Sequence, residues 1–305
     1  MASTYSQGTT GSAAELYALS PVASAWLNSR DDFIAMAASS HLAVGDDTAA
    51  VVHYDLENAE SDNADGRRGV GSPEPVAEGG SLQTRSVTLY DWGKEVILDP
   101  NDPSLRGQDP DTIGAQRGAS KLADVLERRM GGLIASSTTP WTLADAGVGA
   151  TWKTATTDIL GDLVDNLVLF DAQNSLVSHR PNAMAVSREA WLNLRMNTAM
   201  NSGGVDRVGI NSDQAALAAL NGIGITHVFV GPTSIYAGYV NIFYYSDNPV
   251  VSPGGIVFAH KGMSGEAATV SRVQRGHRRV GYYVYTCGGY VVIPEYGFRL
   301  TGATA

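Results

Sequence analysis

The sequence predicts an α+β fold, and three observations lead to this prediction. Two strand-like runs enclose a long polar insertion near the N-terminus, and the longest amphipathic helix pattern of the chain follows them. Shorter helices come next, and a series of strand-like segments fills the C-terminal part. Because helices and strands do not alternate regularly, we do not expect a doubly wound parallel sheet. No internal repeat of fixed period is visible.

Composition supports a globular protein with a core. The chain has 305 residues, of which 44% are hydrophobic and 17% charged. No apolar run approaches the roughly 18 residues that a membrane-spanning helix needs, so we expect no membrane association. The polar first residues lack the pattern of a secretion signal. The single cysteine, Cys287, leaves no possibility of an internal disulfide or a thiolate metal cluster.

The first 48 residues contain one plausible helix, at about 13–28, which carries apolar residues such as Leu19 and Ala23. Pro21 fits the start of a helix better than its middle, because proline has no backbone N–H to donate. We expect residues 1–48 to be an arm that packs on something else.

Two β-runs follow, at 50–56 and 86–98, and residues 57–80 between them are rich in Gly, Pro, Asp and Glu. Hairpin loops usually have about 2 to 5 residues, so this insertion is too long for an ordinary turn. Such a loop is usually functional or disordered, and we expect that only a partner would order it.

The clearest helix is predicted at about 111–136. Its apolar residues recur at steps of three and four and form one stripe: Ala115, Ala119, Leu122, Leu126, Met130 and Leu133. Asp109 and Asp111 lie at its start, where carboxylates complement the exposed N–H groups. A calcium site built from Asp99, Asp102, Asp109 and Asp111 lacks the alternation of a known loop. We therefore interpret these residues as turn and cap residues.

The second half predicts three more helices and six strands. The helices are expected at about 157–178, from 188 onward after the cap Ser187, and at 213–220. A short apolar run at 183–186 precedes Ser187. The strand-like segments are 225–230, 240–245, 255–260, 267–273, 280–286 and 290–293.

Charge is distributed unevenly along the chain. The net charge is -10, but residues 31–111 alone hold 17 acidic and five basic residues, and the remainder is slightly positive. An arginine cluster stands near the C-terminus: Arg272, Arg275, Arg278 and Arg279. Solvated loops are one interpretation, and complementary surfaces on copies of one subunit are another. A nucleic-acid-binding groove is not expected, because it needs a dominant basic surface.

No motif with a catalytic spacing is present. The sequence has no phosphate-binding loop, no Gly-x-Ser-x-Gly elbow and no His-Glu-x-x-His helix. The six histidines are scattered, and His227 and His260 fit satisfied sheet residues better than ligands. Cys287 fits a buried thiol better than a nucleophile. Four tyrosines that could stack on a ligand fit sheet packing better: Tyr282, Tyr283, Tyr285 and Tyr290. We expect no catalytic residue, cofactor or metal.

Three stretches in this order resemble major capsid proteins of tailed bacteriophages with the Hong Kong 97 fold. The first is 49–98, a strand, loop and strand that run into an Asp/Pro turn and a long helix. The second, 152–197, contains a helix, the segment Arg-Pro-Asn-Ala-Met-Ala-Val-Ser and an amphipathic helix. The third, 267–299, has a strand, an Arg-rich loop, another strand and the ending Tyr-Val-Val-Ile-Pro-Glu-Tyr-Gly-Phe.

The resemblance implies a domain organisation. It consists of an N-terminal arm at 1–48, an extended loop at 49–98, a peripheral domain at 99–139 and 263–290 with a spine helix at about 111–136, and an axial domain at 140–262 and 291–305.

The resemblance also implies a non-enzymatic major capsid protein. Many copies, as hexamers and pentamers, would form an icosahedral or prolate shell around double-stranded DNA, without sequence-specific DNA binding. Portal, separate scaffolding and decoration proteins are the implied partners. The implied location is the virion, assembled in the host cytoplasm. Only four lysines exist and none lies in 57–85, so we expect no cross-linking between subunits.

Two alternatives stay open: the shell protein of an encapsulin-type nanocompartment, and a cytoplasmic enzyme of unknown reaction. Under the capsid interpretation, charged residues of the loop and the Asp/Pro turn would meet the arginine cluster of an adjacent copy. The candidate contact residues are Arg67, Arg68, Glu74, Glu78, Asp109, Asp111, Arg272, Arg275, Arg278 and Arg279.

Overall fold

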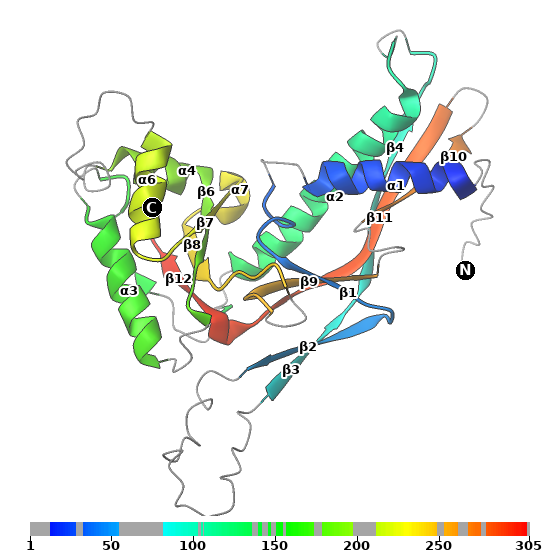
Figure 1. The fold of residues 1–305 in the computed structure, drawn as a ribbon. Helices are drawn as coiled ribbons and strands as arrows, with labels where there is room; N and C mark the ends of the chain where they lie inside the picture. Colours follow the sequence, from blue (N-terminus) through cyan, green and yellow to red (C-terminus); the bar gives the residue numbers. More distant parts are fainter. Residues whose placement is uncertain are drawn as a thin grey trace, which may run out of the picture.

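Two five-stranded sheets, each with helices packed on it, form two lobes of an elongated molecule (Figure 1). The computed structural model describes residues 13–28, 33–54, 82–102, 105, 107–135, 140–141, 146–147, 151–154, 157–173, 179–197, 212–248, 253–261, 268–275 and 279–303. The helices are α1 (Ala13–Asn28), α2 (Pro110–Ile134), α3 (Ile159–Gln173), α4 (Arg188–Met196), α6 (Ser212–Gly222) and α7 (Thr233–Tyr236), with a 3₁₀ turn η4 (Pro294–Tyr296). None of the helices in these ranges combines the length and hydropathy that crossing a bilayer requires.

The first sheet is built around β11 (Arg279–Val292), the longest strand. Along one edge β11 pairs with β4 (Tyr90–Leu98), and along the other it pairs first with β10 (Thr269–Arg275) and then with β9 (Ile256–Lys261). All three pairings are antiparallel. Strand β1 (Ser40–Ala43) extends the sheet by pairing in parallel with β9.

The second sheet has the order β5-β12-β8-β6-β7. Its strands are β5 (Ala146–Gly147), β6 (Ala183–Ser187), β7 (His227–Gly231), β8 (Tyr239–Phe243) and β12 (Gly297–Thr301). Only η4 separates β12 from β11, so this short turn links the two sheets. Strands β2 (Thr48–Tyr54) and β3 (Leu82–Thr88) form a separate antiparallel pair.

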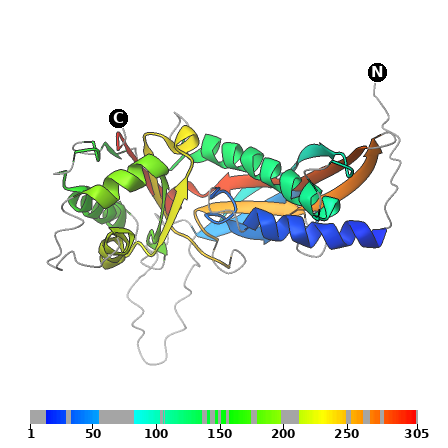
Figure 2. The ribbon, with the colours of Figure 1, turned by 90° about the horizontal axis from the view of Figure 1, so that it is seen from above.

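Helix α2 packs its apolar stripe on the first sheet, and α1 lies alongside α2 and β10 (Figure 2). The predicted stripe is buried except for Leu133, which is partly buried. A second core lies between the second sheet and helices α3, α4 and α6, and Ile159, Leu163 and Phe170 contribute to it from α3. These positions agree with the predicted helix faces.

The expectation that residues 1–48 pack outside their own chain is wrong for the described part. Leu19, Ala23 and Leu27 of α1 are buried in the core of the same subunit, together with Ile34 and Ala38. Helix α1 also satisfies the free edge of β10. Ser20 Oγ accepts the Val270 N–H at 3.2 Å, and Ser24 Oγ accepts the Ala268 N–H at 3.2 Å. Because unpaired edge groups are costly when buried, this pairing favours packing within the chain. Pro21 lies inside α1, and its ring is exposed.

Two further strand predictions need correction. The run 86–98 is not one strand: Leu89 is buried, its N–H is donated to Asp47 O, and the residues on either side of it belong to different sheets. Conversely, 280–286 and 290–292 belong to one strand, because Cys287 and Gly288 pair with β4 and with β9, and Ile293 lies just beyond its end. The sheets therefore group β4 and β9 with β11, whereas the predicted boundaries place β4 in the loop and β9 in the axial domain. Strand β12 was not predicted as an element.

Candidate inter-subunit surface

The predicted contact residues that the structure describes gather where α2 begins beside β10 and β11. Asp109 caps α2: its carboxylate accepts the N–H groups of Asp111 at 3.3 Å and Thr112 at 3.1 Å. The hydrogen bond from the Thr112 side chain, helped by Arg272, holds the pKa of Asp109 below its usual value. The cap interpretation of Asp109 is thus confirmed. Asp99 also serves a turn, since its Oδ1 accepts the Asn101 N–H at 2.9 Å.

Asp111 and Arg272 meet within one subunit. Arg272 Nε lies 3.4 Å from Asp111 Oδ1, and the Tyr282 hydroxyl donates to the same oxygen. Burial of Tyr282, together with this carboxylate, raises the pKa of the phenol. Tyr282 is fully buried in the small core cluster with Val96 and Val280. The acidic turn and the first arginine of the cluster therefore neutralise each other locally.

Arg275 also has a partner in its own chain, because its Nε lies 2.8 Å from Glu95 Oε1 on β4. Arg279 is directly opposite Arg275 in the β10–β11 ladder, so two arginine side chains start from paired positions of neighbouring strands. Arg279 is exposed and forms no ion pair with any residue that the structure describes. Arg67, Arg68, Glu74, Glu78 and Arg278 lie outside the described residues.

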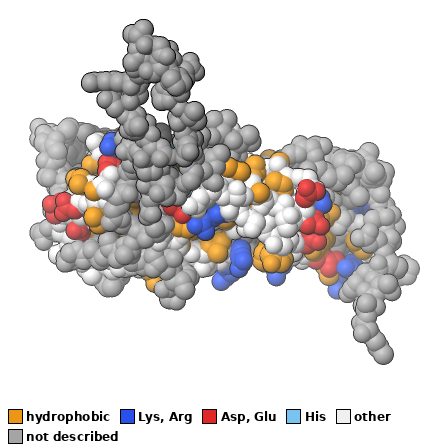
Figure 3. Space-filling view, turned by 90° about the horizontal axis from the view of Figure 1, so that it is seen from below, with side chains coloured by type: hydrophobic (Ala, Val, Ile, Leu, Met, Phe, Trp, Pro, Cys, Tyr) orange, Lys and Arg blue, Asp and Glu red, His pale blue; other side chains and the backbone are white. Residues whose placement is uncertain are grey.

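Sequence reasoning missed Glu95 and the apolar side chains on the surface. The role of Glu95 as the partner of Arg275 follows only from the pairing register of β4 and β11, which the sequence does not reveal. Ile97 of β4 is 52% exposed and Tyr283 of β11 is 37% exposed, and the Tyr283 ring stacks on Tyr285 at 5.3 Å. On the face seen in Figure 3, acidic, basic and hydrophobic side chains lie next to one another.

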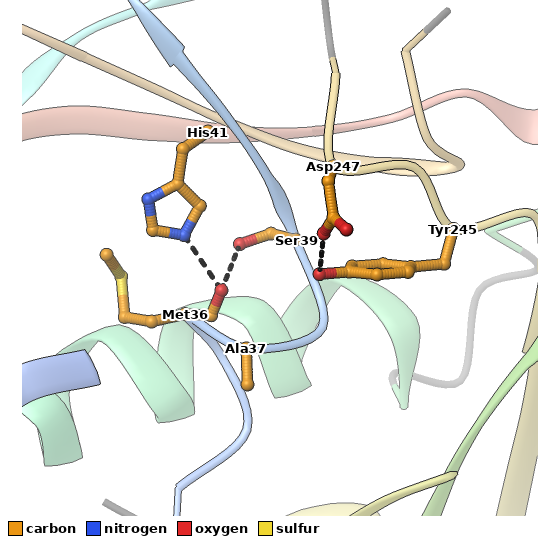
Figure 4. A pocket seen from close by; sticks show the side chains of 6 residues that line it. All are labelled: Met36, Ala37, Ser39, His41, Tyr245 and Asp247. Carbon is orange, nitrogen blue, oxygen red and sulfur yellow. Dashed lines mark hydrogen bonds between the residues drawn. The ribbon is translucent and has the colours of Figure 1, made fainter. Parts of the chain in front are cut away.

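A pocket of about 210 Å³ lies between the turn at 36–39, β1 and the segment after β8 (Figure 4). It is lined by Met36, Ala37, Ser39, His41, Tyr245 and Asp247. His41 Nε2 is 2.8 Å from Met36 O, Ser39 donates to the carbonyls of Ala35 and Met36, and Tyr245 donates to Asp247 at 2.6 Å. The serine, histidine and aspartate are thus each bonded to other groups and form no catalytic relay.

The other residues with possible chemistry have structural roles. Burial raises the pKa of the Cys287 thiol, and Asp91 raises it further, which disfavours the thiolate that a nucleophile needs. Tyr282 and Tyr290 are buried, as sheet packing requires. His260 is buried on β9 against Phe258, as predicted for a sheet histidine, while His227 lies exposed at the start of β7. No group of three metal-binding side chains occurs in the described ranges.

Comparison with solved structures identifies the fold. A phage-related protein from Bordetella bronchiseptica superposes with a TM-score of 0.65 at 15% identity, covering 93% of this chain and 97% of that protein. The capsid of Myoviridae phage XM1 matches with a TM-score of 0.52 at 13% identity, covering 88% and 92%. The encapsulin complex of Synechococcus elongatus gives 0.50 at 13% identity, covering 88% and 86%. The sequence matches no protein-family model, and no curated protein at a significant level.

The chain therefore has the Hong Kong 97-like fold, and the predicted α+β class is confirmed. The structures that share this fold include phage capsids and an encapsulin.

Proposed function

We propose that this protein is the major capsid protein of a tailed bacteriophage. The observation that carries the proposal is a match over nearly the whole chain: 93% of it aligns with 97% of a phage-related protein, and 88% aligns with 92% of a phage capsid protein. Copies would assemble as hexamers and pentamers into an icosahedral or prolate shell around double-stranded DNA in the virion, after assembly in the host cytoplasm. Portal, separate scaffolding and decoration proteins would be its partners. The net charge of -10 suits a container for DNA, because a strongly basic inner surface would bind the packaged DNA tightly.

Negative-stain microscopy of the purified protein, together with gel filtration, tests this function. We expect closed shells that elute in the void volume. A small, discrete oligomer would contradict the proposal and favour an enzyme.

An encapsulin-type compartment is the second candidate, because the encapsulin scores almost as high as the phage capsid, 0.50 against 0.52. The contents of shells from the native source distinguish the two. Full-length double-stranded DNA supports the phage head, and an enclosed enzyme without DNA supports the compartment.

For contacts between subunits, we propose that Arg278 and Arg279 bind acidic residues such as Glu74 and Glu78 in the loop of an adjacent copy. The loop arginines Arg67 and Arg68 would contribute in the same contact. Arg279 supports this proposal because it is exposed and has no ionic partner among the described residues. The other candidates have partners in their own subunit: Asp109, Asp111, Arg272 and Arg275. We assign them the role of holding the start of α2, β10 and β4 in place beside Arg279.

Charge reversal tests the contact. Arg278→Glu combined with Arg279→Glu should reduce the yield of shells several-fold while circular dichroism shows a folded subunit. Each exposed pair contributes only about 0 to 1 kcal/mol, so the effect depends on repetition over many interfaces. Arg128→Glu is the matched control, since Arg128 pairs with Asp124 on the same helix face at 3.1 Å. Normal shells at normal yield from the double variant would reject the contact.

A further inference from the structure

The β2–β3 pair is held to the rest of the subunit by one face. Along β2 the buried and exposed residues alternate: Ala49, Val51 and His53 are buried, whereas Val52 is 49% exposed. Val51 is directly opposite Arg85 in the ladder, so Arg85 projects from the same face. Two strands alone are marginally stable in water, and the direction of this pair therefore depends on what its buried face contacts.

That face contacts the turn between the two sheets. His53 Nε2 lies 3.5 Å from Glu295 Oε2, and Arg85 contacts the other carboxylate oxygen, Oε1, at 3.2 Å. The His53 ring also meets the Tyr296 ring edge-on, with centroids 6.0 Å apart. Glu295 belongs to η4, which connects β11 of the first sheet with β12 of the second. One carboxylate is thus bound from both strands of the pair at the joint of the two lobes, and Figure 1 shows β2 and β3 beside this turn.

His53, Arg85 and Glu295 are polar groups in a position where apolar side chains would be enough to attach the two strands. His53 is only 1% exposed, and neither of its ring nitrogens forms a hydrogen bond with a described residue, so Nε2 meets Glu295 as a close polar contact at 3.5 Å. A buried polar atom without a partner costs free energy, so an apolar residue would pack here at lower cost. Burial acts to raise the pKa of Glu295, but its contact with His53, a backbone hydrogen bond and the charge of Arg85 together outweigh burial and lower the pKa, which keeps the carboxylate ionised at neutral pH.

We propose that His53, Arg85 and Glu295 form a latch that fixes the direction in which the β2–β3 pair leaves the subunit. The three groups act by position. The hydrogen-bonded ion pair of Arg85 with Glu295 is directional, and the contact of His53, on the other strand, with the same carboxylate defines an angle that apolar packing alone does not. In a shell, an inference that rests on the proposed function, this angle would decide where residues 55–81 meet a neighbouring copy. The latch thus couples the joint between the lobes to the geometry of assembly.

Hydrogen exchange of the purified protein tests the latch. Glu295→Gln keeps the shape of the side chain and removes its charge, and Arg85→Met removes the partner on β3. Either variant should increase the exchange rates of the β2 and β3 amides about tenfold, since a hydrogen bond to a charged group contributes roughly that factor or more. Amides of α2 and of the first half of β11 should be unchanged.

Two comparisons make the result decisive. The double variant should exchange no faster than Glu295→Gln alone, because the ion pair that Arg85→Met removes is one of the two contacts that Glu295→Gln already weakens. Val52→Thr, on the exposed face of the same strand, should leave exchange unchanged. Wild-type exchange rates in both single variants would overturn the latch. This measurement needs no shell, so it can fail while the capsid proposal holds, and it can succeed if the protein forms no particles.

Discussion

The close packing of α2 on β11 gives a prediction with a calculable magnitude. A Cβ added at Gly118 would lie 2.3 Å from Val284 Cγ2 and 3.1 Å from Val284 Cβ, closer than any van der Waals contact. Val284 is fully buried, and β11 is bonded at this position to β4 on one side and β10 on the other. The strand backbone is therefore held on both edges, so either the helix shifts or the Val284 side chain rotates away from its packed position.

The expected cost follows from two opposing effects. Gly to Ala in a helix gains about 1 kcal/mol in helix propensity. An extra methyl group in a packed core typically costs about 1 to 3 kcal/mol. Gly132 of the same helix supplies the control, because a Cβ there meets nothing within 4 Å. Gly132→Ala should have the propensity gain alone, so we expect Gly118→Ala to be less stable than Gly132→Ala by about 1 to 3 kcal/mol.

Urea unfolding followed by circular dichroism measures this difference, with all proteins in the same assembly state. The midpoint should rise for Gly132→Ala and fall, relative to it, for Gly118→Ala. Equal midpoints for the two variants would refute the argument, because they would mean that α2 and β11 are not in the close contact that fixes this lobe.

Two further predictions concern buried ionisable groups. Glu127 is fully buried and accepts the Ala35 N–H at 2.7 Å. Burial raises the pKa of its carboxyl above the ordinary value of 4.5. The unfolded chain therefore loses this proton first as the pH rises above 4.5, and the folded state loses stability. Glu127→Gln should be at least as stable as wild type at pH 8, whereas Glu127→Ala should lose about 2 to 4 kcal/mol in urea unfolding; an equal loss in both would show that the charge itself is needed. Burial, aided by the charge of His41, lowers the pKa of His260 from 6.5 to about 4. The unfolded chain therefore binds the proton first as the pH falls from 6.5 toward 4, and this site should lose about 2 to 3 kcal/mol of stability over that range. His260→Phe should show a correspondingly shallower decline in denaturation midpoint between pH 7 and pH 4.5, and an identical decline would contradict the assignment.

The sequence predicted those elements whose signal is local. The stripe of α2 follows from the spacing of Ala119, Leu122 and Leu126, and the caps Asp109 and Ser187 from their short polar side chains before a helix pattern. The order of elements then led to the fold class, because an extended pair of strands, a long helix and a late group of strands occur in few arrangements.

What the sequence could not predict depends on distant partners. Leu89 divides the run 86–98 only because Asp47 accepts its N–H, and the Gly288 region stays in a strand only because β4 and β9 pair with it on both edges. The partners that the charged candidates have within their own chain were equally out of reach of the sequence. Arg272 and Arg275 find carboxylates in their own chain, at Asp111 and Glu95, and that pairing follows from sheet register.

The length of β11 has a mechanical consequence. Its 14 residues extend roughly 45 Å at the usual rise of a strand, from Arg279 beside the start of α2 to the turn that carries Glu295. Over much of that distance β11 is hydrogen-bonded on both edges, which restricts its bending. The arginine end of the strand and the joint between the lobes are therefore ends of one continuous hydrogen-bonded element.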